Sequence, residues 1–274
     1  MEDYNSTTSA LSLHPLFLAT VLTYYSIFMT IFWLALAGIV GWFVSLLAGG
    51  GSALILMPIV SIFLGAVAIA PVITISGLFG NSERVFVYWQ KINWDVVKWE
   101  LPGAIFGGIL GAFTLTKLKL DWLSILVGIF LIFSAASYFF KNEEKSFTVK
   151  AWYFLPAGFV YAFLSGLIGS MGPVLAPLYI NYGLQKEELL ATQATNRVIV
   201  HIVKIFVYSF LGAFKLPYIG YGIVLGLAAI PGNWLGHLVL QKISEKQFRR
   251  LVISFVLFSG MLILWQQREL LVFW

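Results

Sequence analysis

Apolar segments follow one another along almost the whole chain, and most are long enough to cross a lipid bilayer as helices. A membrane-spanning helix needs about 20 predominantly apolar residues. Ten segments can be marked out, two of them short: residues 30–48, 52–64, 71–89, 101–118, 122–140, 152–168, 174–182, 189–211, 217–240 and 248–265. Charged residues make up only 11% of the chain, against about 25% in soluble domains, so the sequence predicts an all-α multi-pass membrane protein.

Charge distribution and missing motifs exclude several classes of function. The net charge of +5 comes from basic residues scattered through the links between apolar segments, so nucleic-acid binding is not expected. Ten of the basic link residues fall on one side of the membrane and four on the other, which predicts that both termini face outwards. The chain has no cysteine and no zinc-helix, phosphate-loop or nucleophile-elbow motif. We therefore expect no enzyme activity, metal site or cofactor.

A polar loop at residues 141–150, expected to be cytoplasmic, divides the chain into two similar halves. Residues 1–29 are predicted to be a tail with a candidate interfacial helix, residues 30–140 the first transmembrane repeat and residues 151–274 the second. The matching residues are Pro58 with Pro177, Phe86-Val87-Tyr88 with Phe206-Val207-Tyr208, and Gly107 and Gly111 with Gly232 and Gly236, at offsets of 119, 120 and 125. Because five segments per half is an odd number, the halves should form an inverted repeat.

Glycine-rich breaks interrupt the apolar pattern once in each half, and each precedes a short segment. The residues are Gly49, Gly50, Gly51 and Ser52 in the first half, and Gly169, Ser170 and Gly172 in the second. Non-helical backbone survives at membrane depth only inside protein or beside a water-filled cavity. Helices that restart at Ser52 and Val174 would direct free N–H groups and positive dipole ends at that cavity, which favours an oxyanion. Tight turns or close helix contacts are the alternative explanation.

One face of the apolar segment 189–211 carries a stripe of polar residues without an acid. At about 100° per residue they fall within an arc of roughly 80°. The stripe consists of Gln193, Arg197, His201, Lys204 and Tyr208. A cation at the membrane centre costs about 2.5–3.5 kcal/mol, so the stripe predicts a protein-lined anion site. Arg197 would clamp an oxyanion with its planar fork, Lys204 would add a point charge, and His201 would be either a neutral donor or a proton carrier.

Further polar residues are candidate ligands for the same anion. They are Gln193, Asn196 and Thr192 on the same segment, and Asn81 and Arg84 on the repeat-related segment 71–89, where they match His201 and Lys204 at an offset of 120. His237, with Asn233 one turn before it, is a secondary candidate whose alternative role is a hydrogen bond to a carbonyl group. A purely structural network, in which Glu83 pairs with Arg197 or Lys204, is the alternative to an anion site.

The two breaks with the residues that follow them resemble a known family. The sequences are Ala48-Gly-Gly-Gly-Ser-Ala-Leu-Ile-Leu-Met-Pro58 and Gly166-Leu-Ile-Gly-Ser-Met-Gly-Pro-Val-Leu-Ala-Pro177. They resemble the sulfite exporter TauE/SafE family, also called the 4-toluene sulfonate uptake permease family. The second motif departs from the family pattern because Ser170 and Met171 replace part of a fuller glycine run. The resemblance implies transport of sulfite, sulfonates or related anions across a prokaryotic cytoplasmic membrane, with the glycines and serines of both breaks lining the path.

The sequence therefore predicts a secondary transporter of small sulfur-containing anions that works by alternating access. Its expected partners are the anion and the lipid bilayer of the cell membrane. An anion channel is the main alternative, and a membrane subunit without transport activity is the less favoured one. The particular anion, the direction of transport, the coupling ion and a homodimeric state stay open.

Overall fold

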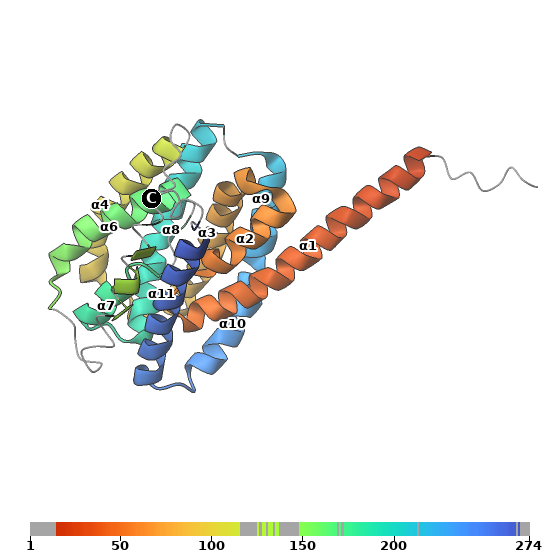
Figure 1. The fold of residues 1–274 in the computed structure, drawn as a ribbon. Helices are drawn as coiled ribbons and strands as arrows, with labels where there is room; N and C mark the ends of the chain where they lie inside the picture. Colours follow the sequence, from red (N-terminus) through yellow and green to blue (C-terminus); the bar gives the residue numbers. More distant parts are fainter. Residues whose placement is uncertain are drawn as a thin grey trace, which may run out of the picture.

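The chain folds into a helical bundle from which the first half of α1 projects (Figure 1). The computed structural model describes residues 15–115, 148–168, 170, 173–212, 214–266 and 268, with single positions between 125 and 136. No strand occurs within these ranges. Five stretches of the described residues are long and apolar enough to span a membrane: Thr20–Leu47, Ala66–Val87, Trp94–Thr114, Leu216–Leu240 and Glu245–Gln266. The all-α, multi-pass prediction is confirmed, although five candidate spans are fewer than the ten segments predicted.

The helices largely follow the predicted apolar segments. In chain order they are α1 (Pro15–Leu47), α2 (Ser52–Leu64), α3 (Ile69–Val87), α4 (Trp94–Leu115), α6 (Phe154–Ile168), α7 (Ala176–Tyr182), α8 (Lys186–Phe210), α9 (Leu216–Leu227), α10 (Ala229–Leu240) and α11 (Glu245–Gln266). Short 3₁₀ turns lie at Ala66–Ala68, Trp89–Lys91 and Ala151–Tyr153. The predicted segment 122–140 and the loop 141–150 fall mostly outside the described residues.

Helix α1 differs from its prediction because it is a single helix. A separate interfacial piece at residues 15–25 was expected, but the helix runs without interruption from Pro15 to Leu47. No proline or glycine occurs between residues 16 and 37 to interrupt it. At about 1.5 Å per residue the helix is longer than the hydrocarbon core of a bilayer, so it must tilt or project beyond the core.

Two other helix boundaries differ from prediction for local reasons. The fourth predicted segment was expected to start at residue 101, yet α4 already begins at Trp94. The cause is Asn93, whose side-chain oxygen accepts a hydrogen bond from the Val96 N–H at 3.1 Å and so caps the helix. The predicted single segment 217–240 is divided at Ala228 into α9 and α10. Pro231, which has no N–H to donate to the preceding turn, explains this division.

Two hydrophobic cores hold the bundle, and each combines helices from both halves of the chain. One core joins α1, α2 and α3 with α9 and α10, through residues such as Leu56, Val72 and Leu225. The other is built largely from α4 with α6, α7, α8 and α11, through residues such as Ala104 and Tyr179. Helices α3 and α8 pack against each other between the two groups. This central pair carries all of the predicted site residues that lie outside the two glycine-rich breaks, apart from the secondary candidates on α10.

Corresponding glycines of the two halves make corresponding close contacts. On α10, a Cβ atom added at Gly232 would lie 2.5 Å from the carbonyl oxygen of Ile39 in α1. On α4, a Cβ atom at Gly107 would collide with the carbonyl oxygen of Phe159 in α6. Ile39 and Phe159 are 120 positions apart, close to the offset between the two glycines. Glycine is thus required at both positions, because each pair of helices is in backbone contact.

Candidate functional site

The first glycine-rich break has the irregular backbone that the sequence predicted. Gly49, Gly50 and Gly51 have φ angles of 66°, 121° and 99°, a region that glycine enters without the steric cost of a side chain. The chain therefore leaves α1 and starts again at Ser52, as expected. No side chain caps the first turn of α2. The Leu54 N–H donates to the Gly51 carbonyl group at 3.0 Å, which leaves the N–H groups of Ser52 and Ala53 and the positive end of the dipole for a ligand.

The cationic stripe of α8 is buried, and its Arg197 reaches the first break. The Arg197 side chain lies so close to the backbone that a Cβ atom at Gly50 would be 2.5 Å from its Nη1 atom. Gln193 connects the two elements: its amide nitrogen donates to the Gly49 carbonyl group at 2.6 Å, and its amide oxygen accepts from Arg197 Nη2 at 2.9 Å. The guanidinium carbon also lies 5.7 Å from the centre of the Tyr161 ring on α6.

A small polar cavity lies where the break, α3 and α8 meet. It has a volume of about 10 Å³, which is room for about one water molecule. The described residues that line it include no acid: Trp42, Gly51, Ser52, Ala53, Leu56, Ile73, Ser76, Gly77, Asn81, Ser170, Arg197 and His201. Ser170 comes from the second break, so residues of both breaks line one cavity. An oxyanion with four or more heavy atoms does not fit this volume, so the conformation is closed around the site.

Two cavity residues present unpartnered polar atoms. The Nδ1 atom of His201 and the Oδ1 atom of Asn81 are buried without a hydrogen-bond partner. The other end of the Asn81 amide donates to the Gly77 carbonyl group at 2.6 Å. Buried polar atoms are rarely left unsatisfied in proteins, so the two atoms indicate a place where a ligand or water binds. The sequence repeat had matched these same two residues.

Lys204 and Arg84 are buried away from the cavity. Lys204 has 0% exposure, and its ammonium group contacts the Ser165 hydroxyl group at 3.3 Å. Arg84 donates to the Asn233 side-chain oxygen at 3.0 and 3.1 Å and to the Ser45 hydroxyl group at 3.1 Å. Asn233 in turn donates to Glu83 at 2.6 Å. Glu83 therefore belongs to a buried polar network, as in the structural alternative considered from the sequence. That network joins Glu83 through Asn233 to Arg84.

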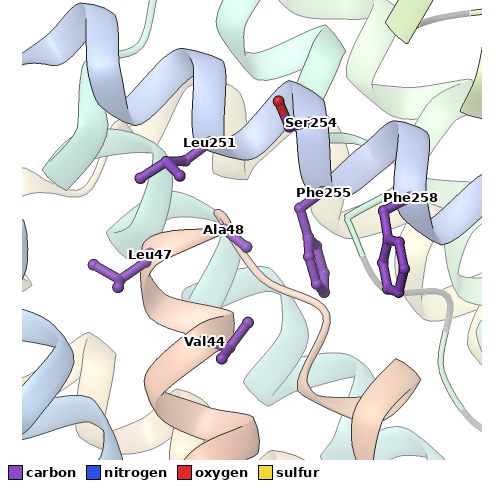
Figure 2. Close-up of a pocket in the computed structure, with 7 residues that line it drawn as sticks. All are labelled: Val44, Leu47, Ala48, Leu251, Ser254, Phe255 and Phe258. Atoms are coloured by element: carbon purple, nitrogen blue, oxygen red, sulfur yellow. The ribbon is translucent and has the colours of Figure 1, made fainter.

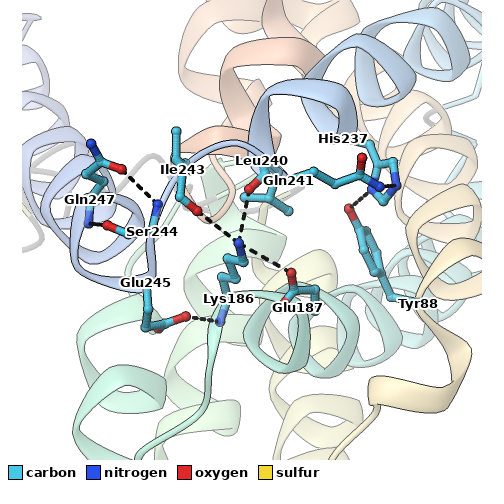
Figure 3. Close-up of polar contacts among 10 residues, drawn as sticks. All are labelled: Tyr88, Lys186, Glu187, His237, Leu240, Gln241, Ile243, Ser244, Glu245 and Gln247. Atoms are coloured by element: carbon cyan, nitrogen blue, oxygen red, sulfur yellow. Dashed lines mark hydrogen bonds and ion pairs between the residues drawn. The ribbon is translucent and has the colours of Figure 1, made fainter.

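The remaining predicted residues have other positions. Thr192 accepts a hydrogen bond from the Asn93 N–H at 2.9 Å. His237 contacts the Tyr88 hydroxyl group at 2.7 Å and the Gln241 side chain at 2.7 Å (Figure 3). In the same region Lys186, at the start of α8, donates hydrogen bonds to backbone carbonyl groups at the end of α10 and in the link to α11. Gly169 and Gly172 lie outside the described residues. The second short helix begins at Ala176 rather than Val174, after a turn in which Ala176 N–H donates to the Pro173 carbonyl group.

An apolar groove adjoins the first break on the side of α11. It has a volume of about 350 Å³ and is lined by Val44, Leu47, Ala48, Leu251, Ser254, Phe255 and Phe258 (Figure 2). Phe255 lies against the break, since a Cβ atom at Gly51 would be 2.6 Å from its ring. The groove has no charged lining residue, so it suits an acyl chain or apolar side chain and not an anion.

Sequence reasoning missed one buried acid, Glu100 of α4. It accepts a hydrogen bond from the Tyr179 hydroxyl group of α7 at 2.6 Å, and both side chains are buried. The residue lay outside the predicted segments because the helix was expected to start at residue 101. Asn93, followed by Asp95, is a helix-start signal that would have extended the helix back over Glu100.

Comparison with known proteins identifies the family of this chain. A family model described as sulfite exporter TauE/SafE matches residues 34–263. The chain belongs to the sulfite exporter TauE/SafE family. No curated protein and no solved structure gave a match. Membership of the TauE/SafE family makes the chain a multi-pass membrane transporter with a transported substrate, and points to a protein that is not an enzyme.

Proposed function

We propose that this TauE/SafE protein is a secondary transporter of sulfite, organosulfonates or related small sulfur-containing anions in the cell membrane. The observation that carries the proposal is the cavity at which Arg197 and His201 meet residues of both glycine-rich breaks. A buried guanidinium group beside an uncapped helix start, with no acid among the described lining residues, is a site for an oxyanion.

Each predicted site residue has a part in this proposal. Arg197 binds two oxygens of the anion, and the N–H groups at Ser52 and the unpartnered His201 and Asn81 side chains add hydrogen bonds. Gln193 holds Arg197 against the break. Lys204, about one helical turn after His201, contributes positive electrostatic potential. Asn196 and Arg84 contribute from outside the cavity lining. Gly49, Gly50, Gly51, Gly169, Ser170 and Gly172 let the backbone approach the anion.

Alternating access is the mechanism that best fits a closed cavity between two similar halves. A cavity of about 10 Å³ must enlarge before an anion enters, which requires the helices around it to move. The similar contacts of Gly107 and Gly232, and the contribution of both halves of the chain to each core, support two inverted repeats. In transporters of this design one repeat-derived unit moves against the other around a central site.

Counterflow of radiolabelled sulfite in proteoliposomes tests the proposal. We expect saturable exchange in the wild type and a loss of affinity of about 10- to 150-fold in Arg197→Ala, which corresponds to the loss of a charge-assisted hydrogen bond of about 1.5–3 kcal/mol. Arg268→Ala, which removes an exposed guanidinium group near the C-terminus, is the control and should retain exchange. Anion currents without saturation or counterflow would indicate a channel. Full exchange in Arg197→Ala would remove the site assignment.

A further inference from the structure

A second buried polar cluster lies next to Arg197, and of its members only Asn196 has a part in the function proposed above. It consists of Glu100 on α4, Tyr179 on α7 and Asn196 on α8. Glu100 is 2% exposed and accepts the Tyr179 hydroxyl group at 2.6 Å. Asn196 lies beside this pair, within reach of the Glu100 carboxyl group and the Tyr179 hydroxyl group, although neither end of its amide makes a hydrogen bond of ordinary geometry. Asn196 directly precedes Arg197 in α8, so the cluster and the anion site share one helix turn.

The surroundings of the Glu100 carboxyl group provide hydrogen-bonding partners for both its ionised and its protonated state. A buried carboxylate is costly unless a cation or several donors compensate its charge. When Glu100 is ionised, the Tyr179 hydroxyl group and the Asn196 amide nitrogen are donors at hand, and Arg197 is the cation that acts on it. When it is protonated, its O–H needs an acceptor, and the unpartnered Asn196 amide oxygen can supply one.

The positive charge of Arg197 therefore acts electrostatically on two anions that compete for it. One is the ionised Glu100, and the other is the transported anion proposed for the cavity. Protonation of Glu100 removes the first competitor and strengthens the binding of the second. Thermodynamic linkage makes this effect reciprocal, so binding of the anion also favours protonation of Glu100.

We infer that Glu100 is the proton-binding site of the transporter and couples the movement of a proton to that of the anion. The inference rests on the proposed function and extends it from anion transport to proton–anion symport. The Glu100 carboxylate takes a proton from water on the side where the anion enters. It returns the proton to water on the opposite side after the anion has left, so one proton crosses with each anion.

The elements packed around Glu100 bring few other titratable groups to it within the described part of the chain. Helix α7 contributes Tyr179 and α8 contributes Arg197. Helix α6 presents backbone there, because a Cβ atom at Gly158 would lie 2.7 Å from Glu100 Cγ. His201 lines the anion cavity itself and is the rival proton carrier, which the experiment must separate from Glu100.

Binding of methanesulfonate to the purified full-length protein at a series of pH values tests the inference. Methanesulfonate stays a monoanion across neutral pH, so any pH dependence belongs to the protein. We expect wild-type affinity to fall about tenfold per pH unit on the alkaline side. Glu100→Gln, which mimics the protonated carboxyl group, should bind independently of pH. Asp95→Asn is the matched control, because it removes an acid on the same helix whose side chain is 77% exposed, and it should keep the wild-type slope.

Transport in proteoliposomes provides a second readout. An inward proton gradient should drive accumulation of radiolabelled methanesulfonate in the wild type but not in Glu100→Gln, which should still show counterflow. If Glu100→Gln does not fold, Tyr179→Phe replaces it. This variant removes a donor to the ionised form, so the fall in affinity should begin at higher pH. If methanesulfonate does not bind, sulfite replaces it as the probe. Sulfite itself titrates near neutral pH, but this contribution is the same for wild type and variant. It therefore cancels when the slopes of affinity against pH are compared.

Two results would overturn the inference while leaving the anion site intact. One is that Glu100→Gln keeps the pH dependence of methanesulfonate affinity, or the gradient-driven accumulation, that the wild type shows. The other is a pH dependence that only His201→Gln abolishes, which would make His201 the proton carrier. Failure of the wild type to bind or exchange either anion at any pH would instead contradict the proposed function.

Discussion

Substitution of Gly50 by alanine offers a direct test of how the first break and Arg197 form one site. The added Cβ atom would lie 2.5 Å from Arg197 Nη1 and 2.9 Å from Nη2, whereas ordinary contact begins at 3.4 Å. The guanidinium group must therefore retreat by about 0.9 Å, and the Gln193 amide nitrogen, 2.9 Å from the same Cβ atom, must move with it. We expect the loss of about one charge-assisted hydrogen bond to the anion, about 1.5–3 kcal/mol, or about 10- to 150-fold in Kd.

The backbone strain of this substitution can be measured separately with a matched variant. Gly50 has a φ angle of 121°, so alanine there also costs about 1–3 kcal/mol of folding stability. Gly65, at the other end of α2, has a φ angle of 83°, and a Cβ atom there would meet nothing within 4 Å. Gly65→Ala thus reproduces the backbone strain without displacing Arg197. Both variants should unfold at lower temperature, but only Gly50→Ala should lose anion affinity.

Titration calorimetry with sulfite and thermal unfolding in detergent give the two quantities. If Gly50→Ala binds sulfite as tightly as the wild type, the contact between the break and Arg197 has no part in anion binding. Equal losses of affinity in both variants would mean that the effect comes from α2 as a whole. Either result would refute the geometric argument.

Two further predictions concern the scaffold. Gly232→Ala should destabilise the protein by about 1–3 kcal/mol through its contact with the Ile39 carbonyl oxygen, whereas Gly220→Ala, with open space around the new Cβ atom, should be neutral or stabilise by up to about 1 kcal/mol. Thermal unfolding ranks the pair, and a reversed order would contradict the packing of α10 on α1. Arg84→Gln should cost about 3–5 kcal/mol of stability because Glu83 and Asn233 lose their cation. Loss of sulfite binding at an unchanged unfolding temperature would instead make Arg84 a ligand.

Features that depend on short-range chemistry could be predicted from the sequence. The break at Gly49–Gly51 follows from glycine alone, because three consecutive positive φ angles exclude other residues. The orientation of α8 follows from helical periodicity. Arg197 and Lys204 are 7% and 0% exposed, while Phe206 on the opposite face is 73% exposed. A charged stripe in an apolar helix has few stable orientations, so its burial can be predicted without knowing which helices pack against it.

Features that depend on distant contacts could not be predicted. Glu100 and Tyr179 are 79 positions apart, and neither lies in a motif that signals the other. The role of Arg84 depends on Asn233, which is 149 positions away. The repeat suggested that Arg84 and Lys204 would act alike, but equivalence in sequence does not give both cations the same neighbours. The continuity of α1 was missed for a different reason: nothing marks the end of a helix that merely extends beyond the membrane.

At the offset of the predicted repeat, α8 brings more positive charge to the proposed anion site than α3 does. At an offset of 120, Arg84 of α3 matches Lys204 of α8, but the preceding Glu83 matches Val203. Helix α3 thus carries a cation and an adjacent acid, joined through Asn233, and contributes little net charge. The apolar part of α8 carries Arg197 and Lys204 with no acid between them. Two identical halves would place equal charge on both sides of the cavity. Two differences at this offset, Val203 in place of an acid and Arg197 in place of Gly77, leave the excess positive charge on α8, whose Arg197 lines the cavity together with residues of both breaks.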